Sequence, residues 1–216
     1  MADLKHSPSF ATLIGDVVGS RTAPDRSGLH EQLAGTLAGA NARLRPTVPL
    51  RITVADEFQG CFSTVGEAVH ASLWLSLHLA PAQLRHGIGW GTAAVLSDEP
   101  RVEDGPGWWV ARAAIEAVKA DAARAGTRLL RTAYRRAEDT DGPDPGPVNA
   151  ALMCRDQMMG SVSERSLRLL RGTLDGRTQA ELAGDEGVSA SAVSQRMRKD
   201  GLVVILAADE LLRGVA

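Results

Sequence analysis

Short apolar runs alternate with amphipathic stretches through the first 126 residues of the chain. Runs rich in apolar residues at 10–20, 49–63 and 83–96 predict strands, and the second run folds back at a tight turn over 55–57. Apolar spacing suited to one face of a helix recurs at 28–44, 65–80 and 108–126. The order β-α-β-β-α-β-α predicts an α+β fold, a ferredoxin-like α/β sandwich with a mostly antiparallel sheet.

Details within these runs add expectations about packing. Ile52, Val54, Phe58 and Cys61 are the expected core residues of the predicted hairpin. The third strand-like run, QLRHGIGWGTAAVL, has glycines at 87, 89 and 91, which indicates that bulky side chains are excluded there. The segment that follows, SDEPRVEDGPG, predicts a loop.

The composition changes at residues 138–149, EDTDGPDPGPVN, where three prolines and two glycines lie among acidic residues. Such a segment is typical of a loop or linker. Beyond it the pattern is almost entirely helical. We therefore predict two domains, 1–147 and 148–216, with the helix at 149–160 packing back on the first domain or bridging the two.

The segment TQAELAGDEGVSASAVSQRMRKDG, 178–201, predicts a helix-turn-helix in an all-α second domain. Gly187 provides the turn, Val188 fills the corner, and Val193 holds the second helix against the first. Ser189 is the expected cap of that second helix. A capping box formed by Ser161 and Glu164 is expected to begin the helix before it.

The second helix of this motif carries short polar residues suited to base edges and cations suited to phosphates. Between residues 163 and 199, seven Lys and Arg face five Asp and Glu, a local net charge of +2. This pattern predicts binding to double-stranded DNA, and the alternative is a helical bundle without a ligand. The predicted DNA-binding residues are Thr178, Gln179, Ser189, Ser191, Ala192, Ser194, Gln195, Arg196, Arg198 and Lys199.

The apolar tail LVVILAADELLRGV, 202–215, has two equally simple interpretations. It closes a homodimer, which would let paired recognition helices read half-sites about one DNA turn apart. Alternatively, it packs against the core of its own chain.

Composition narrows the class of protein. The chain has 216 residues, 44% of them hydrophobic, and a formal net charge of −2. Cys61 and Cys154 lack metal-ligand spacing and are expected to be reduced and mostly buried thiols. The N-terminus has no apolar leader, and no run approaches the roughly 18 apolar residues of a membrane span. We expect a cytoplasmic protein without a membrane partner.

Asp16 interrupts the apolar run LIGDVVGS, and a buried carboxylate needs a partner. Asp56 lies in the predicted hairpin turn, far enough along the chain for one crossover helix between neighbouring strands. Two carboxylates at adjacent strand ends can share a divalent cation, and Glu57 is a third candidate ligand. The alternative is structural: one aspartate caps a helix and the other closes a turn.

The residues after Asp16 lead into a helix, where free backbone N–H groups favour phosphate. The predicted phosphate-binding set is Val17, Val18, Gly19, Ser20 and Arg21. A carboxylate pair beside an anion-binding loop suits a complex of a metal ion with a triphosphate.

This arrangement resembles the palm domain of class III nucleotide cyclases. Across nearly all of its length the chain resembles the SatD family, through LIGDVVGSR, DEFQG, DGPGWWVAR and TQAELA…GVSASAVSQR. The resemblance implies a pocket for a nucleotide with Mg²⁺ or Mn²⁺, and it places Arg112 at a ligand-binding position. ATP is the first expectation, and GTP and cyclic nucleotides are alternatives. Trp108 stands where the cyclases carry an asparagine that acts on the transition state, which implies binding without turnover.

Three hypotheses follow. The first is a dimeric DNA-binding regulator whose N-terminal domain senses a nucleotide and a metal ion. The second is an active nucleotide cyclase, or a related phosphoryl-transfer enzyme, with a DNA-binding tail. The third is a structural dimer whose acidic pair binds nothing and whose DNA binding is constitutive.

Overall fold

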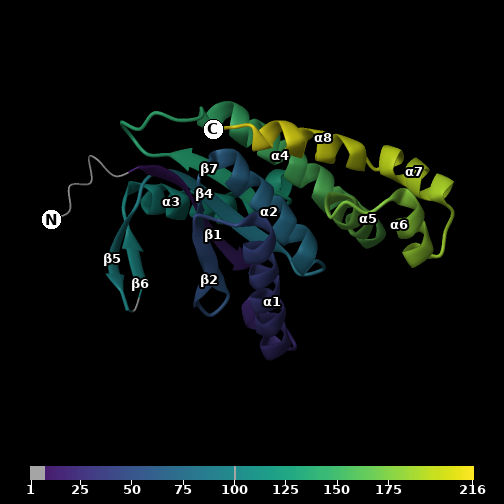
Figure 1. Ribbon diagram of the computed structural model, residues 1–216, viewed down its shortest axis with the longest axis horizontal. Coiled ribbons are helices and arrows are strands. Elements are labelled where there is room, and N and C mark those ends of the chain that lie inside the picture. The colour runs from purple at the N-terminus through teal and green to yellow at the C-terminus, as the bar shows by residue number, and fades with distance from the viewer. Residues whose placement is uncertain (1–7, 100) are drawn as a thin grey trace.

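The computed structural model describes residues 8–99 and 101–216, and it has a five-stranded sheet at its centre (Figure 1). The strands lie in the order β2-β3-β1-β4-β7. Their bounds are β1 (Ser9–Val17), β2 (Val48–Val54), β3 (Glu57–Phe62), β4 (Leu84–Thr92) and β7 (Thr132–Arg136). Only the β4–β7 pair is parallel. The predicted α+β fold with a mainly antiparallel sheet is confirmed.

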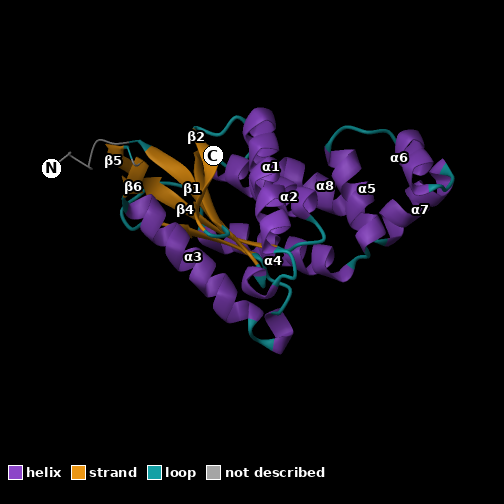
Figure 2. Cartoon of the chain, turned by 90° about the horizontal axis from the view of Figure 1, so that it is seen from below, coloured by secondary structure: helices purple, strands orange, loops and turns teal. Residues whose placement is uncertain are grey.

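Helices cover both faces of the sheet (Figure 2). On one face, α1 (Arg26–Leu44) and α2 (Val65–Leu79) contribute to a core with Leu13 and Val17 of β1. On the other face, α3 (Pro106–Ala122) packs on Ile14 of β1. A side chain at Gly87 or Gly89 of β4 would collide with the backbone of α3. These glycines therefore let α3 approach the sheet closely, as their pattern predicted.

Two elements were not expected from the pattern. The predicted loop over 97–107 contains most of a hairpin of β5 (Ala94–Asp98) and β6 (Arg101–Asp104), which forms a separate two-stranded sheet. Arg51 of β2 donates a hydrogen bond of 2.8 Å to Glu103 of β6, so this hairpin is tied back to the main sheet. Strand β7 was not predicted, because its two apolar residues, Ala133 and Tyr134, form too short a run and are followed by two arginines.

The C-terminal part of the chain is helical. It consists of α4 (Pro145–Ser161), α5 (Glu164–Leu174), α6 (Gln179–Glu186), α7 (Ala190–Lys199) and α8 (Leu202–Arg213). Helix α4 begins inside the predicted linker, with the Asp144 side chain accepting a hydrogen bond from the Gly146 N–H. Val148 and Leu152 of α4 belong to the core of the sheet, so this helix packs back on the first predicted domain.

Helix α2 belongs to two cores at once. Its residues Ala68, Val69 and Leu75 pack in the core between the helices and the sheet. Leu73 and Leu77, on another side of the helix, pack in the core that α5, α6, α7 and α8 form. A helix that is apolar all round needs a partner on every side. The two predicted domains therefore share α2.

Polar contacts reinforce this junction. His70 Nδ1 of α2 lies 2.7 Å from Asp209 Oδ2 of α8, and Asp209 is buried. His78 Nε2 of α2 lies 3.0 Å from Asp175 Oδ2 at the end of α5. The Gly66 N–H at the start of α2 donates to the Val215 carbonyl, so the C-terminus also lies against α2.

Several local expectations were wrong. Ser161 ends α4 and donates to the Gln157 carbonyl, while Ser163 caps α5 by accepting from the Ser166 N–H. Val54 lies next to the β2–β3 turn and is 72% exposed. Cys154 is exposed on α4, whereas Cys61 is buried, and burial raises the pKa of the Cys61 thiol to about 12.

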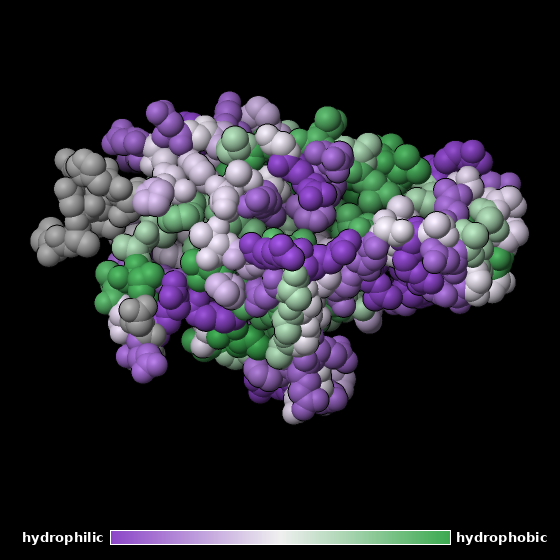
Figure 3. All heavy atoms as spheres, in the orientation of Figure 1, coloured by the Kyte–Doolittle hydropathy of each residue, from purple (hydrophilic) through white to green (hydrophobic). Residues whose placement is uncertain are grey.

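The apolar tail forms α8, whose inner residues Leu202 and Ile205 are buried against the core of its own chain. Its outer residues Val203, Val204 and Leu211 are exposed, and Figure 3 shows apolar surface gathered over this region. No helix in the described residues is long and apolar enough to cross a membrane. Residues 1–7, where no apolar leader is expected, lie outside the described part of the chain.

A buried polar cluster lies where α4 meets α2 and β7. Arg155 is 5% exposed and donates to the Val69 carbonyl and to the hydroxyls of Ser72 and Thr132. His86 is fully buried nearby, and neither ring nitrogen has a hydrogen-bond partner among the described residues. Burial, with the charge of Arg155 adding to it, lowers the pKa of His86 to about 3.

We predict that His86 makes the fold sensitive to acid. Below about pH 6.5 the unfolded chain takes up a proton at His86 that the folded protein does not bind, so stability falls as the pH falls. Between about pH 7 and about pH 5, this histidine accounts for a loss of roughly 2 kcal/mol that His86→Leu does not show. Urea unfolding of both proteins at the two pH values measures the difference, and parallel pH profiles would contradict the expected burial of a neutral ring.

Candidate functional site

The end of β1 and the β2–β3 turn come together at one edge of the sheet. Strand β1 lies between β3 and β4, with Gly15 opposite Phe58 and Asp16 opposite Arg85. Asp56 in the turn accepts a hydrogen bond of 3.2 Å from the Val17 N–H. Residues far apart in the sequence therefore meet at the end of β1.

The Asp16 carboxylate has two basic partners. Its Oδ1 accepts a hydrogen bond of 2.8 Å from Arg85 Nε on the neighbouring strand, and its Oδ2 lies 3.3 Å from Lys119 Nζ on α3. Asp16 is 8% exposed, so water contributes little to balancing its charge and the two cations do so instead. The aspartate inside the apolar run thus has its charge neutralised within the chain.

Glu57, the first residue of β3, is bound by Arg112 of α3. The two guanidinium nitrogens of Arg112 donate hydrogen bonds of 2.5 and 2.6 Å to the two carboxylate oxygens. This pairing raises the pKa of Arg112. Arg112, Glu116 and Lys119 recur every three or four residues, so they lie on one face of α3, above the end of β1.

Lys119 also contacts Glu116, whose Oε1 accepts a hydrogen bond of 2.8 Å from its ammonium group. Burial alone would lower the pKa of Lys119, but the Glu116 hydrogen bond and the charge of Asp16 raise it above its usual value. Lys119 is therefore a firmly charged ammonium at the working pH of most proteins.

The predicted metal ligands do not form an open cation site. Asp16 and Glu57 are held by basic side chains, and Asp56 is engaged with the β1 backbone. In residues 8–99 and 101–216, no group of three or more His, Cys, Asp or Glu side chains is arranged to hold a metal ion. The reason is that β4 and α3 place basic side chains beside these carboxylates, and the spacing of the carboxylates in the sequence does not reveal those partners.

The loop after β1 differs from β1 in how its backbone N–H groups are used. The N–H groups of Val17 and Val18 are used by Asp56 and by the Gln83 carbonyl. By contrast, the N–H groups of Gly19, Ser20 and Arg21 donate no hydrogen bond within the described chain. Gly19 has φ 72°, a left-handed conformation that turns the loop into the short helix η2 (Ser20–Thr22).

A cavity of about 320 Å³ adjoins this loop. Val17 and Ser20 line it from the loop, and Ala55 and Asp56 line it from the turn. The first turns of α1 add Arg26, Ser27, Leu29, His30 and Leu33. Arg26 and His30 are exposed, and their side chains have no ion pair among the described residues. Neither residue was predicted from the sequence. Their position just after the predicted phosphate-binding loop could have indicated them.

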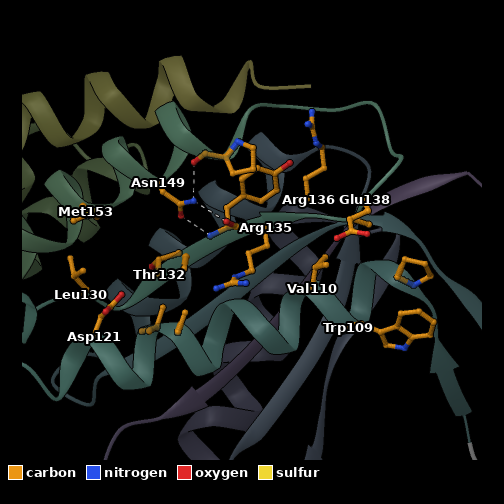
Figure 4. A pocket seen from close by; sticks show the side chains of 17 residues that line it. Trp109, Val110, Asp121, Leu130, Thr132, Arg135, Arg136, Glu138, Asn149 and Met153 are labelled. Carbon is orange, nitrogen blue, oxygen red and sulfur yellow. Dashed lines mark hydrogen bonds between the residues drawn. The ribbon is translucent and has the colours of Figure 1, made fainter.

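Another cavity, of about 780 Å³, lies elsewhere, between α3, β7 and α4 (Figure 4). Trp109, Arg135 and Met153 line it, and Arg135 has no hydrogen bond or ion pair from its side chain in the described chain. Trp109 is 59% exposed, whereas Trp108 is buried between α3 and the sheet as a packing residue. None of the predicted ligand-binding residues lines this groove.

The predicted DNA-binding residues lie on α6, α7 and their caps. Thr178 and Glu181 form a capping box at the start of α6, and Ser189 caps α7 by accepting from the Ala192 N–H. Gly187, with φ 64°, joins the two helices. Val193 is buried against the neighbouring helices as expected, whereas Val188 is 37% exposed and does not fill the corner.

Helix α7 separates its buried and exposed faces cleanly. Val193 and Met197 are buried, and Ser194 is half-buried. Arg196 lies 3.5 Å from Asp200, whereas the side chains of Arg198 and Lys199 have no partner in the described residues. The other predicted residues are exposed: Gln179, Ser191, Ala192 and Gln195.

Comparison with known proteins gives a family and a set of structures. The model of the SatD family matches residues 10–212. No curated protein matches the chain in sequence. A structure of a bacterial light-regulated adenylyl cyclase has a TM-score of 0.45 and 12% identity, with 58% of this chain covered. The match covers 42% of that cyclase chain, so the present chain corresponds to less than half of it.

Two further structures are similar to the chain. Another structure of a bacterial light-regulated adenylyl cyclase has a TM-score of 0.44 and 13% identity, covering 58% of this chain and 74% of that one. The adenylyl cyclase CyaB from P. aeruginosa has a TM-score of 0.37 and 12% identity, covering 48% of this chain and 69% of that one.

We predict that Asp16 stabilises the fold. Asp16→Asn leaves Arg85 and Lys119 without their shared anion in a poorly hydrated site, and the free energy of unfolding falls by roughly 1–3 kcal/mol. Glu116→Gln, at a carboxylate that is 57% exposed, costs less than about 0.5 kcal/mol. Urea unfolding at neutral pH compares the two variants. An Asp16→Asn protein as stable as wild type would instead indicate a carboxylate held free for a ligand.

Proposed function

The chain belongs to the SatD family, and we propose that it is a DNA-binding regulator whose α/β part binds a phosphorylated ligand, ATP first. The observation that carries the proposal is the exposed face of α7, which is polar along its first turns and basic at its end. A helix that follows a tight turn and presents such a face suits the major groove of duplex DNA. In this proposal residues 1–147 bind the ligand and 148–216 bind DNA.

The side chains of α7 suit two kinds of contact with DNA, to base edges and to phosphates. Ser191 and Gln195 have donors and acceptors for base edges, and Arg198 and Lys199 supply charge for phosphates. Val193 and Met197 pack in one core with residues of α5 and α6, so the exposed side chains of α7 are held on a rigid element. The capped start of α7 adds the positive end of a helix dipole toward DNA.

The phosphorylated ligand is proposed to bind in the cavity beside the β1–α1 loop. Three consecutive free N–H groups, at Gly19, Ser20 and Arg21, resemble the backbone concavities that bind anions. Arg26 at the start of α1 adds positive charge on the same side, and the His30 side chain lines the cavity beside it. Arg112 is not included, because both terminal nitrogens of its guanidinium group donate hydrogen bonds to Glu57.

Regulation requires that the ligand favours one arrangement of α7 over another. Leu33 of α1 lines the ligand cavity and also packs in the core that contains α2. Helix α2 in turn packs against α5 and α8. We propose that this contiguous core carries the effect of the ligand to α7. The exposed Val203, Val204 and Leu211 on α8 suit a second copy of the chain, which would pair two α7 helices.

For DNA, we predict that Arg198→Ala weakens binding by removing one phosphate contact. The slope of log affinity against log salt falls in magnitude by about 1. Fluorescence anisotropy with a labelled duplex of about 20 base pairs, over a range of KCl concentrations, measures this slope. Arg43→Ala, which removes the same charge from the far end of α1, is the matched control. Equal slopes for wild type and both variants would mean that α7 does not contact DNA.

For the ligand, we predict that Arg26→Ala weakens ATP binding about tenfold, because a charge-assisted contact to phosphate is lost. Isothermal titration calorimetry compares it with Arg43→Ala, which shares the helix and the charge change but lies away from the cavity. Equal affinities for the two variants would remove the ligand from this cavity. If the protein converted ATP into a cyclic nucleotide during the titration, it would be an enzyme and not a sensor.

A further inference from the structure

The carboxylates at the end of β1 are matched by positive charges from the same chain. Asp16 meets Arg85 and Lys119, and Glu57 meets Arg112 through two hydrogen bonds. With Glu116 beside Lys119, three carboxylates face three basic groups. A divalent ion added to this set would introduce excess positive charge unless it displaced a basic side chain.

Lys119 is the group in the position to be displaced. Its ammonium lies 3.3 Å from Asp16 Oδ2 and 2.8 Å from Glu116 Oε1, so it bridges two carboxylates as a small cation would. Arg85 approaches the other oxygen of Asp16 from the paired strand, where its backbone is fixed by the β1–β4 register. The lysine side chain comes from a helix surface and is 31% exposed, so it is the more easily replaced partner.

We propose that Lys119 is a built-in cation that takes the place of a divalent metal ion at Asp16. Its consequence for the ligand rests on the proposed function: the phosphorylated ligand binds with the loop N–H groups and Arg26, and without Mg²⁺. The positive charge that holds Asp16 is then always present and does not depend on the metal content of the surroundings.

The placement of Lys119 follows from the packing of α3. Glycines at 87 and 89 let the α3 backbone lie directly on β4, which brings the helix close to the end of β1. Lys119 lies two turns beyond Arg112 on the same face, so the two basic residues reach Asp16 and Glu57 side by side. The four-carbon stem of lysine spans the remaining distance to Asp16.

The test is a titration of the nucleotide-free full chain with Mn²⁺, in which the free ion is measured by electron paramagnetic resonance. Wild type is expected to take up no Mn²⁺ at Asp16. Lys119→Met keeps the apolar stem but exposes Asp16 and Glu116 to the ion, and its Mn²⁺ affinity is expected to be at least tenfold higher. Lys119→Arg keeps the charge and should behave as wild type.

Two further controls fix the interpretation. Lys199→Ala removes a charge from α7 and should gain no Mn²⁺ site, whereas Lys119→Met with Asp16→Asn should lose the new one. Circular dichroism shows whether each variant is folded, and Lys119→Gln serves if the methionine variant is not. Equal Mn²⁺ affinities in wild type and the uncharged Lys119 variants would overturn the proposal. These measurements contain no nucleotide, so a failure of ATP binding would leave their outcome unchanged.

Discussion

The structure depends on α2, a helix that is buried on more than one side. Ala68, Val69 and Leu75 close the core over the sheet, while Leu73 and Leu77 belong to the core of the C-terminal helices. Neither core is complete without this helix, and burial of its side chains contributes to both. The pairs His70–Asp209 and His78–Asp175 fix its orientation relative to α8 and α5. The cavity lined by α1 and the exposed basic residues of α7 therefore belong to one continuous packed body.

The ion pairs at the end of β1 neutralise the carboxylates that lie there. Asp16 is buried, as the apolar residues around it in the sequence predict, and its carboxylate forms ion pairs with Arg85 and Lys119. The free N–H groups of the β1–α1 loop and Arg26 lie on the α1 side of this strand end, where the phosphorylated ligand is proposed to bind. The end of β1 thus separates a neutralised carboxylate cluster on the α3 side from the proposed ligand cavity on the α1 side.

Much of the fold could be predicted from periodicity, because strands and helices with one apolar face leave a regular pattern. The order of β1, α1, β2, β3, α2, β4 and α3 follows it closely. The larger apolar residues of the β5–β6 hairpin, Val95, Leu96 and Val102, are exposed, and a hydrogen bond between Arg51 and Glu103 ties the hairpin to the main sheet. Apolar spacing alone therefore did not predict it. The shared role of α2 was missed because sequence shows that a helix is apolar all round without showing what covers each side.

The site was predicted in part for a similar reason. The meeting of Asp56 with the end of β1 follows from hairpin topology, but the partners of Asp16 depend on the β1–β4 register and on the face that α3 presents. The most direct test of the account measures duplex DNA affinity of the full chain with and without saturating ATP, and ATP affinity with and without DNA. Coupling through α2 predicts the same factor in both directions, about fivefold or more. Identical affinities in the presence and absence of the second ligand would contradict it.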